Sequence, residues 1–332
     1  MTQPDDRPIR WGILATGGIA RAFTRDLALE PGSEVVAVGS RSQVSADAFG
    51  DEFGVPHRHG SYQALVNDPD VDVVYVATPH PGHHGAALLA INAGKAVLVE
   101  KPFAMDAAQA REMIDAARER GTFLMEAMWT RFLPHIARVR EILAAGTLGD
   151  VVYLTAEHGQ WFAADPRFRL FAPDLGGGAL LDLGIYPVSF ASLVLGAPAR
   201  ITAVSDRAFT GVDATTSMIF QYGSGAHAVL TTTLRAASGN PAAIYGTAAR
   251  IEIDGWFYTP TAFRVIARDG AELERFDQPY EGHGLRAQAA EVGRCLRAGL
   301  PESPLLPLAE TYTIMQAMDE VRRQIGLSYP PA

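Results

Sequence analysis

Apolar and polar positions follow a regular order along the first 127 residues. The short segments that are almost wholly apolar or β-branched are residues 9–14, 35–39, 71–77, 96–100 and 123–127. Runs of this length and composition predict strands buried on both faces. The segments with apolar residues at helical spacing are 19–30, 44–53, 83–92 and 106–120. Strands and helices in this order predict an α/β domain with a parallel, doubly wound sheet.

A different pattern begins after residue 128. One helix is expected at 136–145, and two more at 285–298 and 308–325. The expected strands between them are 151–157, 201–207, 217–222, 227–234, 250–253 and 262–267. Few helices separate these strands, which favours a mostly antiparallel sheet. We therefore predict two domains, an α/β domain over 1–127 and an α+β domain over 128–332.

Charge and composition argue against nucleic acid and membranes as binding partners. The net charge is −9 with no basic stripe, so no nucleic-acid partner is expected. No apolar run approaches the roughly 20 residues that span a bilayer, so no membrane partner is expected either. Residues 1–8 are polar and have the features of neither a signal nor a transit peptide. The single cysteine, Cys295, is compatible with a reducing compartment, and we expect a cytoplasmic protein acting on a small molecule.

The turn after the first strand carries the first candidate site. It reads Ala15-Thr16-Gly17-Gly18-Ile19-Ala20, close to the dinucleotide fingerprint G-x-G-x-x-G/A. Gly17 would let the backbone approach a pyrophosphate, and the N–H groups at the helix start would hold the anion. Ala15 replaces the first glycine, and such a loop alone is equally a plain tight turn. The strand before it and the helix after it favour the cofactor site.

The end of the second expected strand bears on the choice of cofactor. NAD enzymes usually place an acid there to accept a hydrogen bond from the ribose 2′-hydroxyl. This chain has Gly39, Ser40 and Arg41 instead. A guanidinium suits a 2′-phosphate, so we predict NADP rather than NAD. The alternative is a surface arginine that begins the next helix.

Two further strands end in polar residues. Lys101 ends the strand at 96–100, so its ammonium is expected at the carboxyl edge of the sheet, where ligands bind. The alternative for it is a solvated strand-end lysine. Thr78 is followed by His80, His83 and His84, but no matching Cys, Asp or Glu set accompanies them and no metal is predicted. One of these imidazoles is expected to reach cofactor or substrate.

A glycine-rich segment in the second domain is another candidate. Gly176, Gly177 and Gly178 precede an expected helix in which Asp182 and Tyr186 are i and i+4, on one face. A carboxylate and a phenol placed in this way could share a ligand. The alternative is a capping or ion-paired aspartate and a core tyrosine. The loop at 161–173, rich in aromatic residues and arginine, is either a substrate lid or the cover of an oligomer interface.

These residues together resemble the glucose–fructose oxidoreductase / inositol dehydrogenase (Gfo/Idh/MocA) family, in its dihydrodiol dehydrogenase and NADP-dependent xylose dehydrogenase branch. The segments that carry the resemblance are Trp11-Gly12-Ile13, Glu100-Lys101-Pro102, residues 125–132, residues 178–186 and Gly211-Val212-Asp213. The resemblance implies an N-terminal Rossmann domain and a C-terminal domain with an open-faced sheet. It also implies homodimers formed through that sheet, and hydride transfer at the nicotinamide.

Site residues follow from the resemblance position by position. Lys101 matches the family lysine, Tyr186 the catalytic tyrosine of the branch, and Asp182 the acid one turn earlier. Arg41 matches the 2′-phosphate contact and His83 a histidine near the nicotinamide, whereas His80 stands where many relatives have asparagine. The cofactor-binding residues predicted in this way are Ala15, Gly17, Gly18, Ile19, Ser40, Arg41, Thr78, His80, His83, Glu100, Lys101, Trp129 and Arg169.

The function expected from these residues is NADP-dependent hydride transfer to or from a sugar or a vicinal diol or carbonyl. Tyr186 would exchange the hydroxyl proton, Lys101 would stabilise the alkoxide, and Asp182 would orient a substrate hydroxyl. Two alternatives stay open: nicotinamide-dependent cleavage of glycosides, and a non-catalytic NADP-binding sensor. The sequence leaves the physiological substrate and the direction of reaction open.

Overall fold

The computed structural model describes residues 7–330. Residues 1–6, which contain most of the segment expected to lack a targeting signal, lie outside the described residues, as do 331–332. The chain divides into two compact units. The first contains residues up to Trp129 together with Glu281–Tyr312, and the second contains Thr130–Tyr280 and the chain from Thr313 onward.

The first unit is built on a six-stranded sheet in the order β3-β2-β1-β4-β5-β6. Its strands are β1 (Ile9–Leu14), β2 (Ser33–Gly39), β3 (His57–His59), β4 (Val73–Val76), β5 (Ala96–Glu100) and β6 (Leu124–Ala127). All of the neighbouring strands pair in parallel. The order reverses between β1 and β4, and the carboxyl edge at such a reversal is where dinucleotides bind. The predicted parallel, doubly wound sheet is confirmed.

Buried apolar runs explain the centre of this sheet. Every residue of β4 is buried, and β5 is buried from Val97 to its end. The helices of the unit are α1 (Gly18–Leu27), α2 (Gln43–Phe53), α3 (Tyr62–Val66), α4 (His83–Asn92), α5 (Ala107–Arg120) and α8 (Arg286–Arg297). Helix α4 packs against α5, and α1 packs against α8. The carboxylate of Asp106 accepts the Gln109 N–H at 2.8 Å and thereby caps the start of α5.

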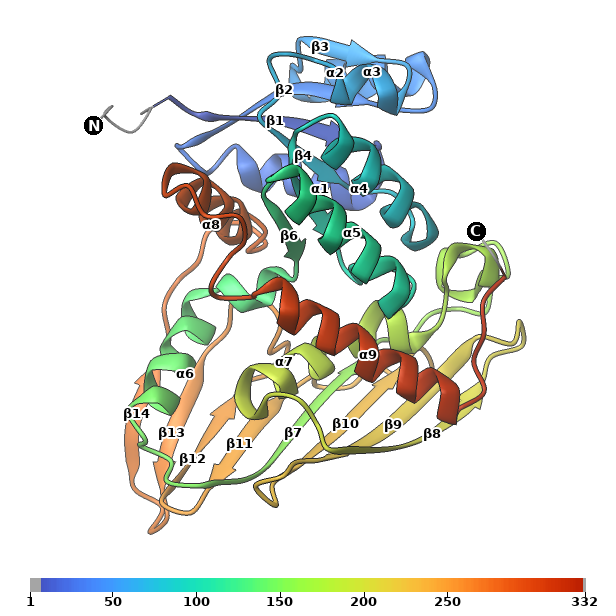
Figure 1. Ribbon diagram of the computed structural model, residues 1–332. Coiled ribbons are helices and arrows are strands. Elements are labelled where there is room, and N and C mark those ends of the chain that lie inside the picture. Colours follow the sequence, from blue (N-terminus) through green and yellow to red (C-terminus); the bar gives the residue numbers. More distant parts are fainter. Residues whose placement is uncertain (1–6, 331–332) are drawn as a thin grey trace. The chain divides into compact units, whose positions relative to one another are not determined.

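The second unit contains an eight-stranded sheet in the order β14-β13-β12-β11-β7-β10-β9-β8 (Figure 1). Its strands are β7 (Val151–Gly159), β8 (Arg200–Arg207), β9 (Asp213–Gln221), β10 (His227–Thr233), β11 (Ala242–Gly246), β12 (Ala249–Ile253), β13 (Phe263–Ala267) and β14 (Glu272–Phe276). Neighbours pair antiparallel except β7 and β10, which pair in parallel. The helices of this unit are α6 (Pro134–Ala144), α7 (Ile185–Leu195) and most of α9 (Leu308–Gln324). The predicted mostly antiparallel sheet is confirmed.

The two faces of this sheet differ. Met218, Phe220 and Leu230 are buried, and α7 packs on β7 and β10. The alternate residues Ile219 and Val229 face away and are 45% and 44% exposed. Side chains of neighbouring residues in a strand point to opposite faces, so one face is covered and the other is open.

The division into units differs from the predicted one at residues 128–129 and, more importantly, at Glu281–Tyr312, both of which were expected in the second domain. The buried carboxylate of Asp26 in α1 accepts the backbone N–H groups of His283, Gly284 and Leu285 at 3.0, 2.9 and 2.8 Å. These bonds join the start of α8 to the first unit. A pattern of neighbouring residues gives no indication of a contact across more than 250 positions.

The expectation that no segment could span a membrane needs correction. Pro173–Leu195 is long and apolar enough to do so by length and composition, although it contains Asp182. Its most apolar stretch is 78% buried inside the protein, as a core helix is. The apolar character of this segment is therefore used in packing α7 against the sheet of the second unit.

Candidate functional site

The turn between β1 and α1 has the geometry of a phosphate-binding loop. Ala15 adopts a φ of 83°, a left-handed conformation usual for glycine, in the place of the first glycine of the fingerprint. A Cβ added at Gly17 or Gly18 would meet no described atom within 4 Å. Gly17 precedes α1, and no described side chain caps this helix end. The free N–H groups and the open space suit a pyrophosphate.

The end of β2 provides the positive charge. A Cβ at Gly39 would lie 2.7 Å from Leu65, so this position cannot hold the acid typical of NAD enzymes. Ser40 follows and is buried, its N–H donating to His59 O at 3.0 Å, while Arg41 is exposed. Burial raises the pKa of Tyr62, and the nearby Arg41 guanidinium opposes that rise. Arg41 and Tyr62 therefore lie close together beside the end of β2.

Two of the predicted cofactor residues hold the ends of strands in place. Oε1 of the buried Glu100 accepts the Tyr75 hydroxyl at 2.5 Å, and its Oε2 accepts the Lys101 N–H at 3.1 Å. The ring nitrogens of His83 lie 2.8 Å from Pro102 O and 2.9 Å from Thr78 O. Burial lowers the pKa of His83 to about 3.

These contacts give His83 a structural role, and its predicted place near the cofactor stays a prediction. Both of its ring nitrogens face backbone carbonyls. The ring joins the turn after β4 to the turn that contains Lys101. In the same place Thr78 Oγ1 is buried and has no hydrogen-bond partner among the described residues, which suits a contact with a bound molecule.

The remaining histidines of this segment have separate environments. His80 is buried, with its ring centroid 5.7 Å from that of His83. The imidazole of His84 lies 2.8 Å from the Glu112 carboxylate at the surface. Three histidines within five residues thus divide between the strand edge and the α4–α5 surface.

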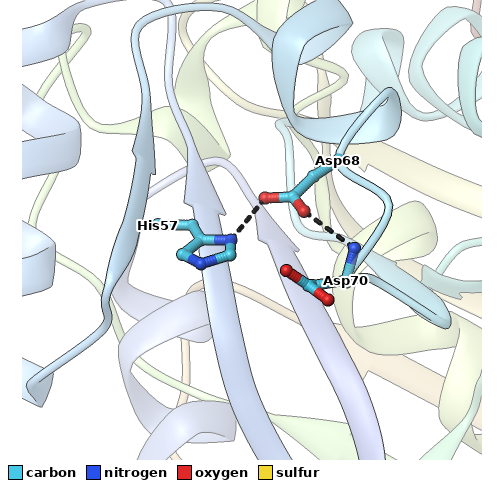
Figure 2. Close-up of side chains that lie close together, drawn as sticks. All are labelled: His57, Asp68 and Asp70. Carbon is cyan, nitrogen blue, oxygen red and sulfur yellow. Dashed lines mark hydrogen bonds and ion pairs between the residues drawn. The ribbon is translucent and has the colours of Figure 1, made fainter.

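One group of described side chains, His57, Asp68 and Asp70, has metal-ligand atoms within 4.8 Å of one another (Figure 2). Asp68 Oδ2 lies 2.8 Å from His57 Nδ1 and 2.8 Å from His59 Nε2, and Oδ1 accepts the Asp70 N–H. Burial raises the pKa of Asp68, but the bonds from His59, the Asp70 N–H and His57 hold it below its usual value. The Asp70 carboxylate pairs with Arg10 at 2.7 Å. These contacts join β3 to the turn before β4.

In the second unit, the segment with Asp182 begins as a π-helical turn, Leu180–Gly184, and continues as α7. Such turns are frequent at functional sites. Asp182 is buried and forms a two-pronged ion pair with Arg169, at 3.0 and 3.1 Å. Arg169 therefore pairs with the predicted catalytic acid, and its predicted contact with the cofactor stays a prediction.

The surroundings of Tyr186 include residues that the sequence analysis missed. Its ring centroid lies 5.1 Å from that of His158 and 4.9 Å from that of Tyr258, and these two rings stack at 4.0 Å. The Gln160 amide contacts His158 Nε2 at 2.9 Å and donates to the Tyr258 hydroxyl at 3.3 Å. Burial raises the pKa of Tyr258. An aromatic cluster from β7 and the segment before β13 thus packs on Tyr186.

The loop at 161–173 packs in part against the rest of the second unit, and its role as a substrate lid or as the cover of an oligomer interface stays a prediction. Phe171 is buried with Leu170 and Leu183 in one apolar cluster, against which Phe162 packs. Trp161 is 64% exposed. The loop therefore anchors its C-terminal half in the second unit.

Comparisons with known proteins decide the family. Residues 9–128 match a family model described as an oxidoreductase family with an NAD-binding Rossmann fold, and residues 136–252 match the GFO/IDH/MocA C-terminal domain. The chain belongs to the Gfo/Idh/MocA family of oxidoreductases. Its predicted family, fold and enzyme class are thereby confirmed.

Relatives cover nearly the whole chain. Trans-1,2-dihydrobenzene-1,2-diol dehydrogenase of Bos taurus is 41% identical over 97% of this chain and 98% of its own, and the Homo sapiens protein is 40% identical over the same shares. A solved 3-ketoreductase from Actinomadura kijaniata in complex with NADP is 30% identical with a TM-score of 0.84, over 96% and 98%. An aldose-aldose oxidoreductase from Caulobacter crescentus is 28% identical with a TM-score of 0.85, over 96% and 97%.

Proposed function

We propose that this oxidoreductase uses NADP to move hydride to or from a vicinal diol or a sugar. One observation carries the proposal: the turn from Ala15 to Gly18 forms an open phosphate cradle in a chain 41% identical to dihydrodiol dehydrogenases. Arg41, at the end of a β2 that has no room for an acid at Gly39, supports NADP over NAD.

The cofactor would be held along one edge of the first unit's sheet. The backbone from Ala15 to Ile19 would bind the pyrophosphate, and Ser40 with Arg41 would bind the 2′-phosphate. Thr78 and His80 follow β4, and Trp129 follows β6, so these residues would lie toward the nicotinamide. Glu100 and His83 would act indirectly, because their polar atoms bind the backbone of Lys101 and Pro102. When bound, the nicotinamide supplies or accepts the hydride.

The chain's own residues would manage the proton and the charge. Tyr186 would take the hydroxyl proton in oxidation and return it in reduction, and Lys101 would stabilise the developing alkoxide. Asp182 would orient a neighbouring hydroxyl of the substrate, and Arg169 fixes the carboxylate for that purpose. A diol or sugar has such a second hydroxyl, which supports this substrate class.

The test is a screen of diols, sugars and their carbonyl products with NADP(H), followed at the nicotinamide absorbance. Turnover of trans-1,2-dihydrobenzene-1,2-diol or an aldose supports the proposal. Cleavage of aryl glycosides without net change in nicotinamide would favour the hydrolytic alternative. Tight NADPH binding with no turnover of any substrate would favour a sensor.

Removal of the Arg41 guanidinium tests the choice of cofactor. We expect Arg41→Ala to raise KM for NADP by about ten- to a hundredfold, the effect of one charge-assisted hydrogen bond. KM for NAD should change little, because NAD has no 2′-phosphate. Steady-state kinetics with both cofactors measure this. Arg120→Ala, at an exposed position in α5, is the control. Equal wild-type kinetics with both cofactors would contradict the prediction.

We also propose a homodimer formed through the open face of the second unit's sheet. Ile219 and Val229 are paired across β9 and β10 on that face, and the neighbouring Val204 is 67% exposed. An exposed apolar sheet face of this kind is typical of a subunit interface. A cytoplasmic location stays a prediction.

Charge placed on that face should disrupt the dimer. We expect light scattering to give a dimer at micromolar concentration for the wild type and a monomer for Ile219→Asp with Val229→Lys. Val44→Lys is the matched control, since Val44 in α2 is 77% exposed and lies in the first unit. A wild-type monomer would refute the proposal.

A further inference from the structure

Asp213, at the start of β9, is the most deeply enclosed carboxylate of the second unit that the proposed chemistry does not use. It is 0% exposed. Its Oδ2 accepts the Leu180 N–H and the Thr216 hydroxyl, both at 2.8 Å. Leu180 is the first residue of the π-helical turn that contains Asp182. The carboxylate therefore holds the start of the helical segment on which Asp182 and Tyr186 lie.

The glycines before this segment are shaped around Asp213 and the preceding loop. Gly178 has a φ of 115°, and a Cβ there would lie 2.2 Å from Asp213 Oδ1. The Gly178 N–H donates to Leu170 O at 2.8 Å, and the Gly177 N–H donates to Ala172 O at 3.0 Å. Both acceptors lie in the loop at 161–173, directly after Arg169, the partner of Asp182. The ion pair and the glycine turn are thus linked through the backbone of residues 169–172.

Tyr329, near the C-terminus, also binds the glycine turn. The Tyr329 hydroxyl donates to Gly177 O at 2.7 Å, and it lies 3.3 Å from where a Gly178 Cβ would be. Burial raises the pKa of Tyr329, and the nearby Asp213 raises it further. Tyr329 and Asp213 therefore enclose the glycine turn together.

We propose that Asp213 and Tyr329 are positioning residues for the reaction: they hold the turn from Gly177 to Leu180, so that Asp182 and Tyr186 meet the substrate in a fixed geometry. This inference rests on the proposed function. Neither side chain needs to touch substrate or cofactor. The carboxyl acts as a hydrogen-bond acceptor for Leu180 and Thr216, and this role does not require its negative charge.

Burial makes the charged form of Asp213 less favourable than it is in water. It raises the pKa of Asp213 to about 6, against the bonds from Thr216 and Leu180 that lower it. Asp213 Oδ1 accepts no hydrogen bond from the described residues. An asparagine could therefore place its side-chain oxygen where Asp213 Oδ2 accepts the two bonds, with its amide nitrogen on the side of Tyr329.

The experiment compares Asp213→Ala with Asp213→Asn, and Tyr329→Phe with Tyr222→Phe. The Tyr222 hydroxyl is also buried but has no partner among the described residues, so its removal breaks no such bond. Three quantities are measured on the full chain: kcat and KM with NADP and trans-1,2-dihydrobenzene-1,2-diol, the Kd for NADPH, and amide hydrogen exchange over residues 177–183.

In Asp213→Ala we expect exchange over 177–183 to become about tenfold faster and kcat to fall by about tenfold or more. The NADPH Kd should stay within about twofold, because the first unit is unchanged. Asp213→Asn should restore both exchange and kcat to within about threefold of the wild type. Tyr329→Phe should accelerate exchange and lower kcat in the same direction, while Tyr222→Phe leaves both unchanged.

Several results would overturn the inference. One is Asp213→Asn behaving like Asp213→Ala. Another is a loss of activity in proportion to unfolded protein, with normal kcat per folded molecule. If Asp213→Ala does not fold, the comparison of Tyr329→Phe with Tyr222→Phe decides. An unchanged kcat and an unchanged exchange rate in Tyr329→Phe would then refute the positioning role. If the wild type does not turn over the diol, the proposed function fails for that substrate, and exchange in the variants still tests the positioning.

Discussion

Replacement of Tyr186 by phenylalanine is expected to lower kcat by about a hundred- to ten-thousandfold, the usual contribution of a general acid–base group. Phenylalanine keeps the ring and its packing against His158 and Tyr258, whose centroids lie 5.1 and 4.9 Å away. The hydroxyl group, with its exchangeable proton, is lost. Binding of NADPH should change little, because the phenol is not expected to contact the cofactor phosphates.

Single-turnover kinetics and NADPH fluorescence titration separate these two effects. Tyr258→Phe is the informative comparison, because it removes the other phenol of the cluster and its bond from Gln160. Burial raises the pKa of Tyr258, which makes it a poor proton exchanger near neutral pH, so a much smaller loss is expected there. Near-normal turnover by Tyr186→Phe together with an inactive Tyr258→Phe would assign the proton to Tyr258.

Replacement of Lys101 by methionine is expected to lower kcat by about a hundred- to a thousandfold, as loss of one preorganised donor to a developing oxyanion does. Methionine keeps the flexible apolar stem of lysine and removes the charge. An ammonium near a phenol favours the phenolate, and an unperturbed phenol titrates near pH 10. In the oxidation direction, kcat rises with pH as the phenol loses its proton, so this ascending limb of the profile should move to higher pH in Lys101→Met.

The chain offers a matched control for this variant. Lys95 and Lys101 are its two lysines, and they flank β5 at opposite ends. The Lys95 ammonium donates to Asp68 O and Val71 O at 2.7 and 2.8 Å. Lys95→Met should therefore lower thermal stability and leave kcat and its pH profile unchanged. A Lys101→Met enzyme with wild-type kcat and profile would remove Lys101 from the chemistry.

Features encoded by neighbouring residues were predictable from the sequence. The buried runs of β1, β4 and β5 predicted a parallel sheet, because only strands covered on both faces are apolar throughout. The glycines after β1 predicted a tight turn, and Ala15 does adopt the left-handed conformation that the turn requires. Lys101 was placed at the sheet edge because a charge cannot remain in the core. Each of these inferences depends on a local pattern and on the chemistry of single residues.

Other features depend on partners far apart in the chain, and only the tertiary structure determined them. β3 is a polar edge strand, so no apolar pattern indicated it. Its residues His57 and His59 are held in place by contacts with Asp68. The Arg169–Asp182 pair, the packing of His158 on Tyr186, and the three amides bound by Asp26 belong to the same class. A hydrogen bond or ion pair needs two specific atoms within about 3 Å. Sequence spacing defines that distance within one helix or strand, but between separate elements it is defined by how they pack.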